Sequence, residues 1–114
     1  MYKREMLKGN TETLLLSLLT EGAKYGYMLV KEIEARSNGY FRVKDGTVYP
    51  ALHRMEKEAL VASVWDSSTN GQSRRVYEIT PKGHQMLKSL KEEWERFCRA
   101  LGLIMGGSDQ PHGD

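Results

Sequence analysis

The sequence lacks the features that form internal disulfides, membrane spans and export signals. Its 114 residues include one cysteine, Cys98, so no disulfide can form within the chain. No apolar run is long enough to cross a bilayer, and the chain does not begin like a signal peptide. We therefore expect a protein that works in the reducing cytoplasm and has no membrane partner.

Residue patterns for catalysis and metal binding are equally scarce. There is no nucleophile paired with a base, no pair of acids at catalytic spacing and no glycine-rich phosphate loop. The three histidines, His53, His84 and His112, and Cys98 do not occur in the close pairs that bind zinc, which favours structural or solvated roles. The sequence therefore predicts neither an enzyme nor a bound metal or cofactor.

Composition indicates one domain with a modest core. Hydrophobic residues make up 39% of the chain and charged residues 28%, which leaves no room for a second independent domain at this length. The formal net charge of +2 permits a polyanionic partner. It falls short of the strongly basic balance of many nucleic-acid-binding domains, so charge alone does not decide the function.

Two helices are predicted before residue 40. Residues 10–19 begin with a possible N-cap at Asn10 and hold so many leucines that the helix should be buried on several sides. A turn follows at residues 20–24. From Gly26 to Ile33 apolar residues recur at helical spacing, until residues 37–39 stop the pattern.

A third helix is predicted to begin near residues 45–47. Pro50 lacks an amide proton and is tolerated in the first turn of a helix, which favours a start close to Thr47. Hydroxyl, aromatic and basic side chains fall on the outward face of this helix. Its apolar face comprises Val48, Leu52 and Met55.

Beyond residue 59 the helical spacing gives way to a β-hairpin pattern. Residues 61–65 and 75–79 are β-prone, and the polar loop between them contains Asn70-Gly71, a favoured hairpin turn. Three helices followed by a two-stranded hairpin is the order of a winged helix-turn-helix, in which the hairpin is the wing. An ordinary α+β domain that does not bind DNA has the same order and stays an alternative.

A long helix is predicted after the hairpin. Thr80 is a suitable N-cap, Pro81 suits the first helical position, and Gly106 and Gly107 end the helix before a polar tail. The apolar residues of this helix step by three and four, as in a heptad repeat. This heptad stripe comprises Leu87, Leu90, Trp94, Phe97, Leu101 and Ile104.

The heptad stripe predicts a homodimer. Full burial of each large apolar side chain contributes roughly 1.5 to 3 kcal/mol, and the helix is longer than a three-helix body can cover. Packing of the stripe on its own domain is the alternative. Trp94 lies in the middle of the stripe, where two indoles of a dimer could hold a small planar aromatic effector, or where the ring could simply fill the seam.

The predicted fold class is α+β, mainly α. It is a winged helix-turn-helix of three helices and a two-stranded wing, with a long C-terminal dimerisation helix. We expect the DNA-binding domain to occupy residues 1–79, the dimerisation helix residues 80–105 and a disordered tail residues 106–114.

The third helix and the wing carry the residues expected to contact double-stranded DNA. A recognition helix presents its first two turns to base edges, and its free N-terminal amides suit a phosphate. On the wing, Arg75 shares a strand face with Tyr77 and Ile79, which makes Arg74 the better candidate for a phosphate contact. The candidate DNA-binding residues are Lys44, Thr47, Tyr49, His53, Arg54, Arg74 and Arg75.

Three segments resemble the PadR family of bacterial transcriptional regulators. They are residues 46–56 (Gly-Thr-Val-Tyr-Pro-Ala-Leu-His-Arg-Met-Glu), residues 25–27 (Tyr-Gly-Tyr) and residues 77–83 (Tyr-Glu-Ile-Thr-Pro-Lys-Gly). The resemblance implies a dimeric repressor whose DNA binding is relieved by a small molecule. A winged-helix protein-interaction module without an operator of its own is the alternative function.

Two positions depart from the family pattern. Ala59 stands where the third helix of such proteins usually ends in glycine, so either a left-handed cap there costs on the order of 1 kcal/mol or the turn has another shape. Val76-Tyr77 stands where the wing usually has a tyrosine pair. The second departure concerns the packing of one wing position and leaves the expected fold unchanged.

Overall fold

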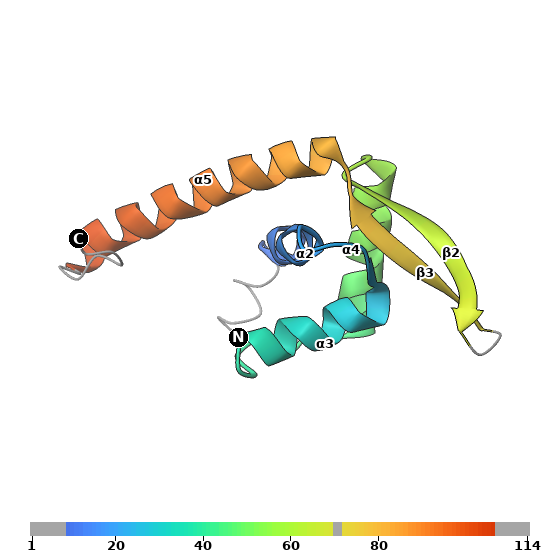
Figure 1. Cartoon of the computed structure of the whole chain (residues 1–114). Helices are drawn as coiled ribbons and strands as arrows, with labels where there is room; N and C mark the ends of the chain where they lie inside the picture. The colour runs from blue at the N-terminus through green and yellow to red at the C-terminus, as the bar shows by residue number, and fades with distance from the viewer. Residues whose placement is uncertain (1–8, 70–71, 107–114) are drawn as a thin grey trace.

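The structure, a computed structural model, describes residues 9–69 and 72–106. Its helices are α2 (Thr11–Leu19), α3 (Gly26–Arg36), α4 (Asp45–Lys57) and α5 (Pro81–Met105), and its strands are β1 (Lys24–Tyr25), β2 (Val61–Thr69) and β3 (Gln72–Ile79). Figure 1 shows α2, α3 and α4 grouped beside the hairpin of β2 and β3, while α5 runs away from this group. The predicted fold class is confirmed. The Asn70-Gly71 turn, His112 and the tail from residue 107 lie outside the described residues.

The core is centred on α2. Its leucines 15, 16, 18 and 19 are all buried, and they belong to one cluster with apolar residues of α3, α4, β2, β3 and α5. Because apolar residues cover several sides of this short helix, the other elements can pack around it, as predicted. Asn10 occupies the N-cap position, but its side chain forms no capping hydrogen bond, so its predicted capping role is wrong.

The sheet has a third strand that the sequence analysis missed. The strand order is β1-β3-β2, and all pairs are antiparallel. Lys24 pairs with Tyr77 and Tyr25 with Val76, so β1 lies along the return strand of the wing. A strand of two residues has no alternating pattern to detect, because it forms only where a longer strand offers free backbone groups.

The hairpin is longer than predicted. Pairing begins with Val61 opposite Ile79 and continues past Asp66 opposite Arg74, with an irregular register between Asp66 and Thr69. The two strands therefore reach well beyond residues 65 and 75, where the β-prone pattern stops. This extra length carries the wing away from the helices (Figure 1).

α4 begins at the first residue of the predicted range 45–47, two residues before the favoured start at Thr47. Asp45 is its first residue, so Pro50 lies inside the helix rather than in its first turn. The amide of Thr47 already donates to the Lys44 carbonyl at 2.9 Å. Pro50 removes the bond that the Gly46 carbonyl would otherwise accept, and Gly46 is exposed, so water can satisfy that group. The preference for a start close to Thr47 is therefore wrong, although the apolar face of the helix is buried as predicted.

α4 ends in a left-handed turn built on alanine. Ala59 has a φ of 64°, in the region that favours glycine. The amide of Leu60 donates to the Met55 carbonyl at 2.9 Å, and the amide of Ala59 donates to the Glu56 carbonyl at 3.0 Å. These two bonds form a Schellman motif. Of the two shapes considered for this turn, the left-handed cap is the correct one.

The first turn of α5 is anchored on the end of α4. The Thr80 hydroxyl accepts from the Gly83 amide at 3.0 Å and lies 2.7 Å from the Ala59 carbonyl, to which it donates. Thr80 therefore caps the helix as predicted, with Pro81 at the first helical position. A Cβ on Gly83 would collide with the Leu60 carbonyl oxygen, so only glycine allows this close approach. The junction fixes the direction in which α5 leaves the domain.

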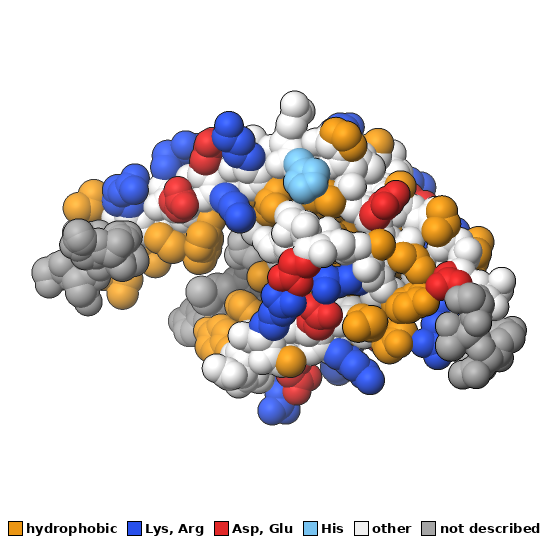
Figure 2. All heavy atoms as spheres, in the orientation of Figure 1, with side chains coloured by type: hydrophobic (Ala, Val, Ile, Leu, Met, Phe, Trp, Pro, Cys, Tyr) orange, Lys and Arg blue, Asp and Glu red, His pale blue; other side chains and the backbone are white. Residues whose placement is uncertain are grey.

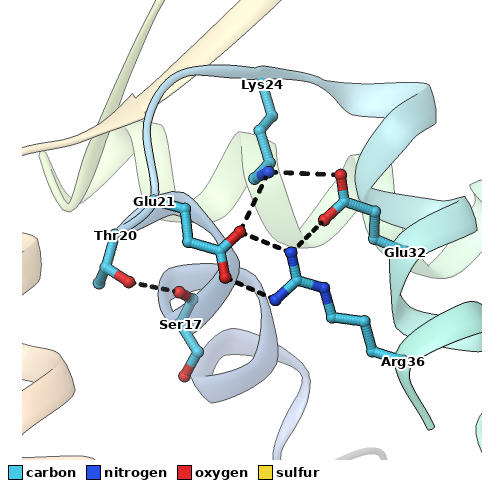
Figure 3. Close-up of polar contacts among 6 residues, drawn as sticks. All are labelled: Ser17, Thr20, Glu21, Lys24, Glu32 and Arg36. Carbon is cyan, nitrogen blue, oxygen red and sulfur yellow. Dashed lines mark hydrogen bonds and ion pairs between the residues drawn. The ribbon is translucent and has the colours of Figure 1, made fainter.

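Four charged side chains tie the turn after α2 to α3 (Figure 3). Glu21 accepts two hydrogen bonds from Arg36, at 2.5 and 2.6 Å. Lys24 lies 3.3 Å from carboxylate oxygens of both Glu21 and Glu32. The hydrogen bond from Arg36 lowers the pKa of Glu21 from 4.5 to about 2. The network holds the segment that leads into β1, and so helps to place the strand beside the wing.

Candidate nucleic-acid interface

α4 has a buried side and an exposed polar side. Its buried side comprises Val48, Ala51, Leu52 and Met55. Thr47, Tyr49, His53 and Arg54 are exposed, and Lys44 is exposed at the N-cap position. The side chains that the sequence assigned to DNA recognition on this helix therefore point away from the core.

A concave surface of about 630 Å³ lies between α4 and the wing. We call it the wing cleft. Its aromatic lining comprises Tyr25, Tyr27, Tyr49, Trp65 and Tyr77. Its remaining lining comprises Gly26, His53, Arg74 and Arg75. The cleft thus brings together four of the predicted DNA-binding residues, while Thr47 and Arg54 on α4 and Lys44 at its N-cap position lie outside the lining.

Arg74 carries a charge that no described carboxylate balances directly. Its guanidinium carbon lies 4.8 Å from the centroid of the Tyr27 ring, and Lys31 approaches the same ring at 5.6 Å. Among the described residues, the ion pairs do not include Arg74. Asp66, its cross-strand partner, accepts a hydrogen bond from the Tyr25 hydroxyl at 2.5 Å. Arg74 is therefore held by an aromatic ring while its donors stay available for an anion.

Arg75 is engaged within the chain. It donates a hydrogen bond to the Ser63 hydroxyl, and Ser63 in turn donates to a Glu56 carboxylate oxygen at 2.7 Å. Arg75 also lies 3.7 Å from that carboxylate and stacks over the Trp65 ring at 4.9 Å. Because Glu56 already balances its charge, Arg75 has less to offer a phosphate than Arg74. This difference agrees with the preference for Arg74 drawn from strand alternation.

The Tyr49 ring lines the wing cleft and packs against Gly26, the first residue of α3. A Cβ on Gly26 would lie 2.6 Å from Cε1 of Tyr49, so the absence of a side chain on Gly26 lets the ring sit against α3. Burial raises the pKa of Tyr49, and the nearby Asp45 carboxylate raises it further. The Tyr49 phenol therefore stays protonated at neutral pH and can donate a hydrogen bond.

The heptad stripe of α5 has a covered half and an uncovered half. Leu87 is 5% exposed and belongs to the core of its own chain, and Leu90 packs against that core. The uncovered half comprises Trp94 (42% exposed), Phe97 (53%), Leu101 (42%) and Ile104 (84%). Figure 2 shows hydrophobic side chains along the lower side of the outer part of α5. The length of α5 thus leaves large apolar side chains without a partner in the described part of the chain.

The uncovered half of the stripe borders a groove of about 510 Å³. The rings of Trp94 and Phe97 stack there with centroids 5.5 Å apart. Asn10 and Thr13, at the start of α2, form part of the facing wall. The groove is lined by α5 and the start of α2, and the wing cleft by α4, the wing and residues 25–27, so the two sites share no lining residue. α5 and the wing leave the helices in different directions (Figure 1).

A model of the PadR-like transcriptional regulator family matches residues 15–89. This span runs from α2 into α5 and contains the whole wing cleft. The chain belongs to the PadR-like family. Members of this family are DNA-binding transcriptional regulators, typically dimeric, and not enzymes.

Transcriptional regulators from other organisms are similar to this PadR-like chain along most of its length. The transcriptional regulator Rv3488 of Mycobacterium tuberculosis is 31% identical, over 97% of both proteins. A transcriptional regulator from Clostridium thermocellum is 34% identical, with a TM-score of 0.80 over 86% of this chain and 95% of that one. A PadR-family transcriptional regulator from Eggerthella lenta is 30% identical, also with a TM-score of 0.80, over 90% and 88% of the two chains.

The described residues of the PadR-like chain contain neither a candidate membrane span nor a cluster of metal-ligating side chains. Among residues 9–69 and 72–106, no helix is long and apolar enough to span a bilayer. Within the same residues, no group of three or more His, Cys, Asp or Glu side chains is placed to hold a metal ion.

Four aromatic residues of the wing cleft, Tyr25, Tyr27, Trp65 and Tyr77, were not among the predicted site residues. Tyr25 and Tyr27 lie beside Arg74 only because β1 pairs with β3, and a two-residue strand leaves no pattern in the sequence. Trp65 lies opposite Arg75 because the register shifts between Asp66 and Thr69; without that shift the Thr69–Gln72 pairing would continue to put Trp65 opposite Val76, so the sequence did not indicate the contact. In this PadR-like chain the aromatic part of the site therefore depends on tertiary pairing, whereas the cations could be predicted locally.

Proposed function

We propose that this chain is a transcriptional repressor that binds a pseudo-palindromic operator as a homodimer and is released by a small molecule. The observation that carries the proposal is that Arg74 has no ion pair among the described residues and lies beside the exposed side of α4. In this arrangement α4 enters the major groove, while Arg74 reaches a phosphate of the flanking backbone. Such a repressor acts on the chromosome, in the bacterial cytoplasm.

The residues of the interface take different parts in this proposal. Thr47 and Tyr49 present hydroxyl groups from the first two turns of α4, where base edges can be read, and His53 presents an imidazole from the start of the third turn. Lys44 and Arg54 flank them and suit phosphates.

The proposed dimer forms through the outer half of α5. Two-fold pairing of this helix, residues 80–105, covers Trp94, Phe97, Leu101 and Ile104 with the same residues of the partner. We expect Leu87 to add little, because it is already buried in its own domain. The pairing holds two DNA-binding domains, residues 1–79, with their recognition helices about 34 Å apart, which is the spacing of successive major grooves on one face of the duplex.

The proposed effector site is the groove beside Trp94. Two copies of the stacked Trp94 and Phe97 rings would face each other in the dimer, and a planar aromatic molecule fits between such rings. The test is the fluorescence of Trp94 in a Trp65→Phe variant, which removes the other indole. Planar aromatic compounds should quench it, and no response across a broad panel would remove this part of the proposal.

The proposal as a whole is tested by a gel shift with the DNA upstream of the chain's own gene. We expect a retarded complex at low salt whose affinity falls steeply as salt rises, and a weaker complex for Tyr49→Ala. Arg99→Met is the matched control, because Arg99 is exposed on α5 away from the stripe. A chain that binds no duplex at low ionic strength would be better described as a protein-interaction module.

A further inference from the structure

The wing cleft has a composition that DNA contact alone does not require. Five of its nine lining residues are tyrosine or tryptophan, and the two charged ones are both arginines. Among the described residues, no carboxylate lines it. A concave site of about 630 Å³ with an aromatic lining and a few convergent polar groups has the size and character of a small-molecule site.

Trp65 is a large aromatic residue that is mostly exposed to solvent in the wing cleft. It is 64% exposed, and its described ring contact is with the Arg75 guanidinium on one side. A second flat ring can therefore stack on Trp65 without displacing any packed side chain. Arg74, stacked on Tyr27, supplies a guanidinium that can bind a phosphate through two hydrogen bonds.

We propose that the wing cleft binds a free nucleotide, with the base stacked on Trp65 and the phosphate held by Arg74. Two features favour this ligand over a single-ring acid. The volume of the cleft exceeds what one ring and a carboxylate fill, and Arg74, whose guanidinium has no ion pair among the described residues, can bind a phosphate monoester through two hydrogen bonds. The bound nucleotide would occupy the space between α4 and the wing.

A regulatory consequence follows, and this part rests on the proposed function. The nucleotide and the operator would use the same Arg74 side chain and the same front of α4, so they would exclude each other. A competing ligand raises the apparent dissociation constant for DNA in proportion to its concentration, without a plateau. An effector at a separate site, such as the groove beside Trp94, gives a plateau set by its coupling free energy.

The test uses the whole chain without DNA, with AMP as the probe and adenosine as the control that lacks the phosphate. The chain has two tryptophans, so its nitrogen-labelled NMR spectrum has two indole signals, which Trp65→Phe and Trp94→Phe variants assign. We expect AMP to shift the Trp65 signal and not that of Trp94, and to bind roughly tenfold or more tightly than adenosine. Arg74→Met should weaken AMP binding by roughly the same factor, while Arg99→Met, which removes one positive charge far from the cleft, should not.

Three results would overturn the inference: no shift of the Trp65 signal at millimolar AMP, a shift confined to Trp94, or equal binding of AMP and adenosine. In a second experiment, AMP should raise the apparent dissociation constant of the chain for its upstream DNA without a plateau. An unchanged DNA affinity at saturating AMP would refute the competition. If the chain binds its DNA but not AMP, this inference fails and the proposed function is unaffected. If the chain binds AMP at Trp65 but binds no duplex, the proposed function fails and the nucleotide site is unaffected.

Discussion

The substitution Phe97→Ala tests whether the outer half of α5 forms the dimer. Phe97 is 53% exposed in the single chain, and full burial of a phenylalanine contributes roughly 1.5 to 3 kcal/mol. Covering the exposed part in a dimer therefore contributes about half of that for each copy. Because a two-fold dimer holds two copies, we expect Phe97→Ala to weaken dimerisation by roughly 1.5 to 3 kcal/mol, or roughly 10- to 150-fold.

Leu103→Ala is the matched control for this prediction. Leu103 is 74% exposed, so it leaves more of its side chain in water than Phe97 does, but it lies about 120° around the same helix. If the heptad stripe is the interface, this variant should dimerise like the wild type. Sedimentation equilibrium of the three proteins measures the dissociation constants. Equal losses in the two variants, or a larger loss for Leu103→Ala, would refute the reasoning, because exposure rather than the stripe would then govern association.

Three further predictions concern the wing, the end of α4 and the charge network. Arg74→Ala should reduce the slope of log affinity against log salt by roughly 1.8 for a dimer, since each phosphate contact contributes about 0.9, and Arg75→Ala should reduce it less. Binding assays at several salt concentrations measure both slopes, and a larger change for Arg75→Ala would contradict the assignment. Ala59→Gly should stabilise the fold by roughly 0.5 to 1 kcal/mol, seen as a higher urea midpoint with an unchanged m value; a lower midpoint would argue against the left-handed turn. In Arg36→Gln the pKa of Glu21 should return from about 2 toward 4.5, as an NMR titration of its carboxyl carbon would report. Because the lowered pKa stabilises the folded chain above pH 4.5, the advantage of the wild type should disappear as the pH falls from 4.5 toward 2, and a pH-independent difference would show that the ion pair is not its cause.

The parts of the fold that could be predicted from the sequence are those with local signals. The heptad stripe of α5, its Thr80 cap and its end at Gly106 depend on residues that are close together in the chain. The parts that could not be predicted depend on distant residues. Glu21 and Arg36 are far enough apart that no helical or strand periodicity relates them. The position of Pro50 favoured Thr47 as the start of α4, but Gly46 is exposed, so water can satisfy the carbonyl that Pro50 leaves unbonded and the helix can begin at Asp45.

In the candidate site, too, some features could be predicted from local sequence signals and others depend on distant residues. Arg74 and Arg75 could be told apart by strand alternation, because the side chains of neighbouring residues on a strand point to opposite faces. The partners that hold them could not be predicted, since Tyr27 reaches Arg74 through β1 and α3, and Glu56 reaches Arg75 from α4. The sequence thus indicates which cation is available, and the tertiary structure explains why.

The central claim is that two chains joined through α5 place their α4 helices in successive major grooves. Hydroxyl-radical footprinting of the wild-type chain on the DNA fragment that it retards tests this claim most directly. We expect two protected patches on one face of the duplex, with centres about 10 base pairs apart. A single short patch, or two patches on opposite faces, would contradict the account.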